Sequence, residues 1–237
     1  MQTVGCLTAW IALSPISPVL AQSVSLCFFI PTATAAPAIT GMLGGNVGFL
    51  TSYLFLGNMA TILTAPLLIP LFSQHGANLT YLSFMLQVFC KVTPTLLLPL
   101  FLAWGVRMVS PAVSAAIVRK SWISYYIWAV MILILISSTF DSLFAPGQKN
   151  WLLEAILALA GVSVCLLLFY AGRRTGRRFS MPIASGQALA QKNLLFGMWL
   201  VFQYLDMAVL ITLTAYSIFQ NMFNAWQLWQ HDRRAAA

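Results

Sequence analysis

Long apolar runs, each close to the length of a membrane-crossing helix, occupy almost the whole chain and constrain its fold more than any other feature. Only 7% of the residues are charged, against about 25% in an ordinary soluble domain. The sequence therefore predicts an all-α, polytopic membrane helix bundle, a single transmembrane domain over residues 1–237, surrounded by a lipid bilayer. Hydropathy predicts about eight spans of roughly 20 residues: 4–20, 23–43, 47–72, 79–109, 122–143, 151–170, 181–204 and 207–229.

Basic residues in the connections predict the orientation. The net charge of +8 would indicate a nucleic-acid partner in a soluble chain, but here the positive residues gather in 107–120, in "RRTGRR" (173–178) and in the C-terminal tail. Counting spans puts these three stretches on one side of the membrane. The positive-inside rule then predicts a multi-pass protein of an inner or plasma membrane with a cytoplasmic C-terminus, and no nucleic-acid partner.

The titratable residues give little support to enzyme chemistry. The chain has four acidic residues and two histidines, and no HExxH or paired-carboxylate motif for acid–base catalysis. Four isolated cysteines without CxxC spacing predict neither a zinc site nor a disulfide. We therefore expect no enzyme and no organic cofactor, and an intramembrane enzyme ranks third among the candidate functions.

Two of the predicted spans are interrupted by helix-breaking residues. Pro31 and Pro37 lie in span 23–43, and Pro182 and Gly186 lie in span 181–204. Each span contains the pattern P-x-A-[ST], and by the span count the two run in opposite directions. Paired discontinuous helices are typical of inverted-repeat secondary transporters, whose substrate and ion sites lie where the two helices cross. Proline kinks without a functional role are the alternative.

The second interrupted span also contains a polar cluster. Gln187 and Gln191 are four residues apart and face the same way in a helix, and Lys192 and Asn193 adjoin them. A charge at the bilayer centre costs about 2.5–3.5 kcal/mol and indicates a functional site; snorkelling to an interface is the alternative for Lys192. Polar candidates from the first repeat are Thr32, Thr34, Thr40, Asn46, Thr51, Ser52 and Asn58.

Three stretches resemble the bile acid:sodium symporter family. "PTATAAPAITGMLGGN" (31–46) is similar to the broken fourth helix of that family, "GQALAQKNLLFGMWLVFQYLD" (186–206) to its broken ninth helix, and "FQNMFNAWQLW" (219–229) to the end of its tenth. The similarity covers most of the chain, and the two broken-helix motifs are its specific part. The resemblance implies inverted repeats with two crossing broken helices, and coupling of organic-anion uptake to two sodium ions.

Family members have ten spans, divided between a panel domain and a core domain. The resemblance therefore implies core-like segments 1–73 and 151–229, a panel-like segment 79–143, and the lack of the first two family spans. A truncated fragment, a mis-assigned start and a shortened member all remain open. The runner-up function is accordingly a truncated, non-transporting membrane fragment or a sensor of the same fold.

The resemblance also assigns the candidate ion ligands. Gln191 matches a glutamine of the second sodium site, whereas Gln187 stands where the best-known members have an acidic ligand and Lys192 where they have an asparagine. Ala36 and Pro37 replace a serine–asparagine pair of the first site. The candidate sodium ligands are Gln187 and Gln191, with Thr51 and Ser52 from the helix after the first broken one.

Because hard cations favour oxygen ligands and negative charge, the loss of a carboxylate and the gain of Lys192 put sodium coupling in doubt. The hypothesis is that the lysine ammonium takes the electrostatic role of a sodium ion, and proton coupling through Lys192 then becomes an option because a buried lysine shifts its pKa readily. An organic anion, bile-acid-like or a smaller carboxylate, stays the expected substrate because a lysine and helix N-termini both attract negative charge. The candidate substrate-binding residues are Lys192, Asn193, Thr34, Asn46 and Asn58.

Overall fold

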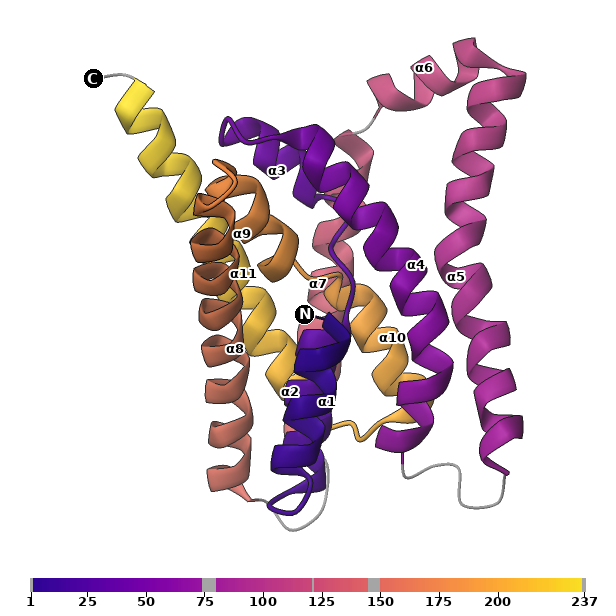
Figure 1. Cartoon of the computed structure of the whole chain (residues 1–237), viewed down its shortest axis with the longest axis vertical. Coiled ribbons are helices and arrows are strands. Elements are labelled where there is room, and N and C mark those ends of the chain that lie inside the picture. Colours follow the sequence, from indigo (N-terminus) through magenta and orange to yellow (C-terminus); the bar gives the residue numbers. More distant parts are fainter. Residues whose placement is uncertain (1, 74–79, 121, 145–149, 236–237) are drawn as a thin grey trace.

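The computed structural model describes residues 2–73, 80–120, 122–144 and 150–235, which form eleven helices and no β-sheet (Figure 1). This confirms the all-α prediction for the described residues. The helices are α1 (Gln2–Leu13), α2 (Pro18–Phe29), α3 (Ala36–Met42), α4 (Val47–Phe72), α5 (Tyr81–Val109), α6 (Pro111–Arg119), α7 (Trp122–Phe144), α8 (Trp151–Arg177), α9 (Pro182–Ala190), α10 (Leu194–Tyr204) and α11 (Val209–Ala235).

Three helices of the described chain are long and apolar enough to cross a membrane: α4, α5 and α8. They support the prediction of a multi-pass membrane protein. Shorter apolar helices form parts of other predicted spans, among them α1, α2 and α10. The predicted span 122–143 corresponds to α7 but is not wholly within the residues whose side chains the structure describes. Helix α11 is long, but buried polar residues interrupt its apolar sequence, among them Gln220, Asn224 and Gln227.

The predicted first span, residues 4–20, is not one continuous helix but contains the short helix α1 and the start of α2. Helix α1 ends at Leu13, and Ser17 begins a new helix as the N-cap, its hydroxyl accepting a hydrogen bond from the Leu20 amide at 3.3 Å. Pro18 occupies the first position of α2, where proline is tolerated because that amide has no helical partner. With 12 residues, α1 extends about 18 Å, and it lies beside α2 (Figure 1).

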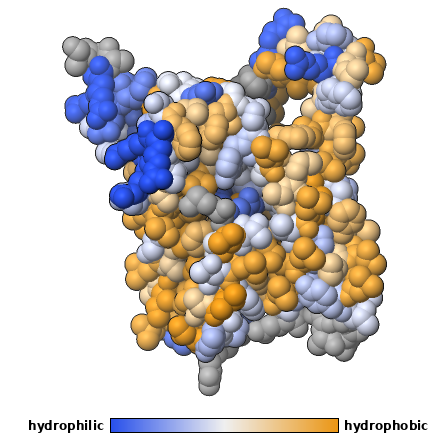
Figure 2. Space-filling view, in the orientation of Figure 1, coloured by the Kyte–Doolittle hydropathy of each residue, from blue (hydrophilic) through white to orange (hydrophobic). Residues whose placement is uncertain are grey.

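The outside of the bundle is apolar between its two ends. Figure 2 shows hydrophobic residues over most of the visible face, with hydrophilic residues gathered at the end where α6 and the C-terminus lie. The side chains of Trp104, Leu133 and Leu159 are each 60% exposed or more, which suits a surface covered by lipid. The basic stretch 173–178 continues α8 through Arg177 instead of forming a loop, and α6, the end of α8 and the C-terminus lie at the same end (Figure 1).

Two helix pairs meet near the middle of the bundle. Helix α2 and helix α9 approach this region from opposite ends, and α3 and α10 continue from it toward opposite ends (Figure 1). Residues 30–35 connect α2 to α3, and residues 191–193 connect α9 to α10. Both interrupted segments therefore place non-helical backbone in the interior, next to each other.

Glycines let α8 pack closely against its neighbours, as small residues commonly do between membrane helices. A Cβ added at Gly172 would meet the Ser185 carbonyl oxygen of α9 at 2.5 Å. One added at Gly161 would overlap the Thr212 carbonyl oxygen of α11. Because these contacts involve backbone atoms, the two glycines determine the distances from α8 to α9 and to α11. Both α9 and α11 contribute to the crossing.

Candidate functional site

The two interrupted segments are joined by backbone hydrogen bonds. Thr32 and Lys192 form an isolated antiparallel β-bridge. The Ala33 amide donates to the Gln191 carbonyl at 2.8 Å, and the Asn193 amide donates to the Pro31 carbonyl at 2.9 Å. The crossing thereby satisfies backbone groups that the broken helices leave unpaired, as buried backbone requires.

The Lys192 side chain occupies the end of a half-helix. Its ammonium group donates to the carbonyl oxygens of Phe28 at 3.1 Å and Ile30 at 3.0 Å, in the last turn of α2 and at its C-cap. These carbonyls carry the negative end of the helix dipole. Lys192 is 6% exposed, so the ammonium is buried at this helix end and does not snorkel to an interface.

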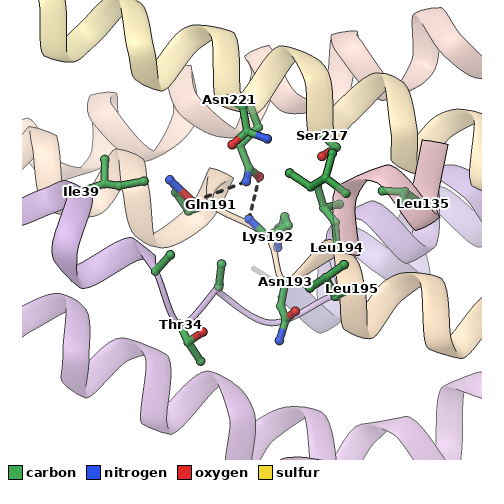
Figure 3. A pocket seen from close by; sticks show the side chains of 14 residues that line it. Thr34, Ile39, Leu135, Gln191, Lys192, Asn193, Leu194, Leu195, Ser217 and Asn221 are labelled. Atoms are coloured by element: carbon green, nitrogen blue, oxygen red, sulfur yellow. Dashed lines mark hydrogen bonds between the residues drawn. The ribbon is translucent and has the colours of Figure 1, made fainter. Parts of the chain in front are cut away.

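Four amide side chains form two hydrogen-bonded pairs between the α9 segment and α11, and one of these pairs contacts the Lys192 backbone. The side-chain oxygen of Gln220 accepts a hydrogen bond from the backbone amide of Lys192 at 2.9 Å, and the Gln220 Nε2 atom donates to the Gln191 Oε1 atom at 3.4 Å (dashed lines in Figure 3). One turn away, the side-chain Nε2 atom of Gln187 donates to the side-chain Oδ1 atom of Asn224 at 3.2 Å. The predicted shared face of Gln187 and Gln191 is therefore the face that contacts α11.

Several atoms of this amide cluster have no hydrogen-bond partner in the described chain. They are the Gln187 Oε1, Gln191 Nε2 and Asn224 Nδ2 atoms, all of them buried. A buried polar group left unpaired costs about 1–3 kcal/mol. The cluster thus offers both a free acceptor and free donors to a ligand or to water in the interior.

A cavity of about 100 Å³ lies against the crossing. Figure 3 shows Gln191, Lys192 and Asn193 on one side of it, Ser217 and Asn221 of α11 on another, and Thr34 from the α2–α3 connection. Among the described residues, no carboxylate lines this cavity. Its polar lining is therefore neutral except for Lys192, and the first turn of α10 adds the positive end of a helix dipole.

Some predicted site residues lie away from the cavity. Asn46 caps the N-terminus of α4, its side-chain oxygen accepting from the Phe49 amide at 2.9 Å. Thr51 and Ser52 are exposed on α4, and the Thr51 hydroxyl donates to the Val47 carbonyl at 2.9 Å. Asn58 is half-buried farther along α4. The structure therefore brings Lys192, Asn193 and Thr34 together at the cavity, but not Asn46, Asn58, Thr51 or Ser52.

The four predicted helix-break residues have different places. Pro31 lies in the α2–α3 connection, directly after the C-cap Ile30. Pro37 lies within the first two positions of α3, Pro182 is the first residue of α9, and Gly186 is buried inside α9. The second interruption lies at Gln191–Asn193 instead. The shared P-x-A-[ST] pattern therefore does not mark equivalent positions, because a proline at a helix start leaves the helix intact.

The polar row of α11 is the part of the site that no candidate from the sequence included. Ser217, Gln220, Asn224 and Gln227 are all buried, and their spacing of three and four residues places them on one helix face. Polar residues repeating at that spacing inside a predicted span were the signal that could have identified them. Asn193 also has a second role, since its side-chain oxygen caps α10 by accepting from the Phe196 amide at 3.2 Å.

Lys91 and Asp206, two further charged residues within or beside the predicted spans, lie away from the crossing. The Lys91 ammonium donates to the Gln203 side chain at 2.9 Å and lies 5.8 Å from the centre of the Tyr204 ring. Asp206 is exposed and accepts from the Ala208 amide at 2.8 Å. Both therefore stabilise the region where α10 ends.

Sequence comparison adds no assignment to this geometry. No known protein-family model matches the chain, and no curated protein sequence matches it.

Proposed function

We propose that this protein is a secondary transporter of small organic anions in which Lys192 replaces a bound cation at a helix crossing. The observation that carries the proposal is the pair of hydrogen bonds from the Lys192 ammonium to the Phe28 and Ile30 carbonyls. Carbonyls at the C-terminal end of an interrupted helix coordinate the coupling ion in transporters of this kind. In this chain a side-chain ammonium already satisfies them.

The crossing itself supports transport over a purely structural role. Two interrupted segments that run in opposite directions and meet in the interior are the signature of inverted-repeat transporters. In this proposal the chain is a bundle of about eight membrane segments, similar to the bile acid:sodium symporters. Segments 1–73 and 151–229 are its core and segment 79–143 its panel. The end that carries 173–178 is cytoplasmic.

The surroundings of Gln187 and Gln191 favour a mechanism without sodium. Their oxygens are suitable ligands for sodium, but a hard cation also needs compensating negative charge, and no carboxylate of the described chain lines the cavity. The Lys192 ammonium supplies a positive charge close by, which would repel a sodium ion. We therefore propose proton-coupled or uncoupled movement of the anion.

The cavity favours a small substrate. A volume of about 100 Å³ is below the roughly 300–1,000 Å³ of pockets that hold drug-sized ligands. Thr34, Asn193 and Ser217 offer hydrogen bonds, and Lys192 and the α10 N-terminus favour negative charge. A short carboxylate therefore fits a cavity of this volume better than a bile acid does.

The test compares ion and ligand effects on purified protein. We would measure the melting temperature in sodium, potassium and choline, each with and without taurocholate or a short carboxylate. The variants are wild type, Lys192→Asn and Lys91→Asn, the last a matched control because Lys91 is exposed and far from the crossing. A ligand at one hundred times its dissociation constant adds about 2.7 kcal/mol, which a melting curve resolves.

We expect sodium to leave wild type and Lys91→Asn unchanged and to stabilise Lys192→Asn specifically. Specific stabilisation of wild type by sodium would overturn the replacement of the ion by Lys192. A second measurement, uptake of labelled carboxylates by wild-type proteoliposomes without sodium, does not depend on whether the variant folds. Absence of uptake for every carboxylate under any gradient would reject transport and favour a non-transporting membrane fragment or a sensor.

A further inference from the structure

A groove between α8 and α11 combines an apolar part with a basic part. Its volume is about 260 Å³. Leu166, Phe169 and Tyr170 of α8 line one part, with Phe223 of α11. Arg173, Arg174 and Arg177 line the part toward the end of α8. From Leu166 to Arg177 the groove follows α8 for about 16 Å, at 1.5 Å per residue.

Two of the three arginines are positioned by neutral partners. The Arg173 guanidinium donates to the Gln227 side-chain oxygen at 2.5 Å and lies 5.6 Å from the centre of the Phe223 ring. The Arg174 guanidinium donates to the Tyr170 hydroxyl at 3.2 Å. In the part of the chain that the structure describes, no carboxylate lines the groove. These contacts orient the positive charges without neutralising them.

The whole end of the bundle around the groove has excess positive charge. Six arginines lie at the ends of α8 and α11 or directly after α8: Arg173, Arg174, Arg177, Arg178, Arg233 and Arg234. The sequence there contains one acidic residue, Asp232. Asp232 is 82% exposed and lies 3.7 Å from the His231 side chain. Within the described residues, no acidic side chain forms an ion pair with the groove arginines.

We propose that this groove binds an anionic membrane phospholipid. The phosphate contacts Arg174 and Arg177 at the end of α8, and an acyl chain lies along the exposed side chains of Leu166 and Tyr170. Basic pockets between membrane helices bind anionic headgroups in this way. The order of the groove, basic toward the end of α8 and apolar toward its middle, matches the order of a lipid from headgroup to acyl chain.

Ordinary interfacial arginines are the competing explanation, because long basic side chains at helix ends snorkel to the headgroup region. Under that explanation, every arginine at this end of the bundle contributes equally to lipid binding. The groove makes Arg174 and Arg177 different from Arg178 and Arg233, which do not line it. A matched pair of double variants therefore separates the two explanations at equal loss of charge.

The experiment titrates detergent-solubilised full-length protein with phosphatidylglycerol and with phosphatidylcholine, and measures binding by native mass spectrometry. The test variant is Arg174→Gln/Arg177→Gln and the control is Arg178→Gln/Arg233→Gln. Arg173 is kept because it also joins α8 to α11 through Gln227. Glycerol 1-phosphate serves as a headgroup without acyl chains, and the melting temperature of each variant reports whether it folds.

We expect wild type to prefer phosphatidylglycerol and the test variant to lose about five-fold in affinity per arginine, the factor for one basic residue near an anionic lipid surface. The control should lose less than about three-fold, because its arginines contribute only screened attraction. Equal losses in both variants would overturn the groove in favour of general surface charge. Equal binding of both lipids, or binding of glycerol 1-phosphate as tight as that of the lipid, would overturn a lipid site. None of these outcomes depends on transport.

Discussion

The Tyr216 hydroxyl is a single group on which the end of α9 depends. Tyr216 is fully buried, and its hydroxyl donates to the Ala190 carbonyl at 2.7 Å. Ala190 is the last residue of α9, so its carbonyl has no partner within the helix. Without this hydrogen bond a buried backbone acceptor would be left unpaired next to Gln191 and Lys192.

We expect Tyr216→Phe to lower the free energy of unfolding by about 1–3 kcal/mol, because it leaves the Ala190 carbonyl buried and unpaired. The matched control is Tyr81→Phe, since the Tyr81 hydroxyl also donates to a carbonyl, that of Leu67 at 2.7 Å, but Tyr81 is exposed. Thermal melts of both variants in the same detergent measure the difference. A loss in Tyr216→Phe no greater than in Tyr81→Phe would show that the end of α9 does not depend on this hydroxyl.

At the scale of elements, the distance between α8 and α9 depends on Gly172. A Cβ at this position would meet the Ser185 carbonyl oxygen at 2.5 Å and the Gly186 Cα atom at 2.8 Å. Both are backbone atoms of α9, so no side-chain rotation relieves the contact. Since α9 carries Gln187 toward α11, a shift of α9 would also disturb the Gln187–Asn224 hydrogen bond.

Gly172→Ala should therefore destabilise the protein by about 1–3 kcal/mol, the usual cost of overpacking an interior. Gly105→Ala on α5 is the control, because a Cβ there has no atom within 4 Å, and alanine favours a helix over glycine by about 1 kcal/mol. Melting temperatures of the two variants should move in opposite directions. A neutral Gly172→Ala would mean that α8 and α9 can separate without cost.

At the scale of the whole molecule, the asymmetry of charge predicts how the bundle sits in a membrane. Asn150, which caps the start of α8, and Arg178, which follows its end, lie at opposite ends of a candidate membrane span. Under the positive-inside rule the Arg178 end is cytoplasmic. A cysteine at either position would then be reachable from only one side of the membrane.

We expect a membrane-impermeant maleimide to label Asn150→Cys in intact cells and Arg178→Cys only in inverted vesicles. The background chain carries Cys90→Ser, because Cys90 is exposed while the other three native cysteines are buried. The parent without either introduced cysteine measures residual labelling. Labelling of Arg178→Cys in intact cells would reverse the orientation and with it the proposed cytoplasmic C-terminus.

The two helix interruptions at the crossing have different causes: one is determined by the local sequence and the other by tertiary structure. The end of α2 follows from the sequence alone, because the residue before a proline disfavours the helical conformation, and Ile30 before Pro31 is extended, with ψ at 131°. The long apolar helices and the gathering of arginines at helix ends follow from composition and pattern in the same way. These features can be predicted from local backbone preferences and from the contrast between lipid and water.

The end of α9 depended on tertiary structure. Between Gln187 and Asn193 the sequence contains no proline or glycine, so nothing local requires the helix to stop at Ala190. It stops where Lys192 pairs with Thr32 and where the Lys192 amide donates to Gln220. The polar cluster of residues 187–193 could thus be predicted from one segment. The contacts of this cluster with α2 and α11 could not be predicted, because those residues lie far away in sequence and meet it only when the helices pack.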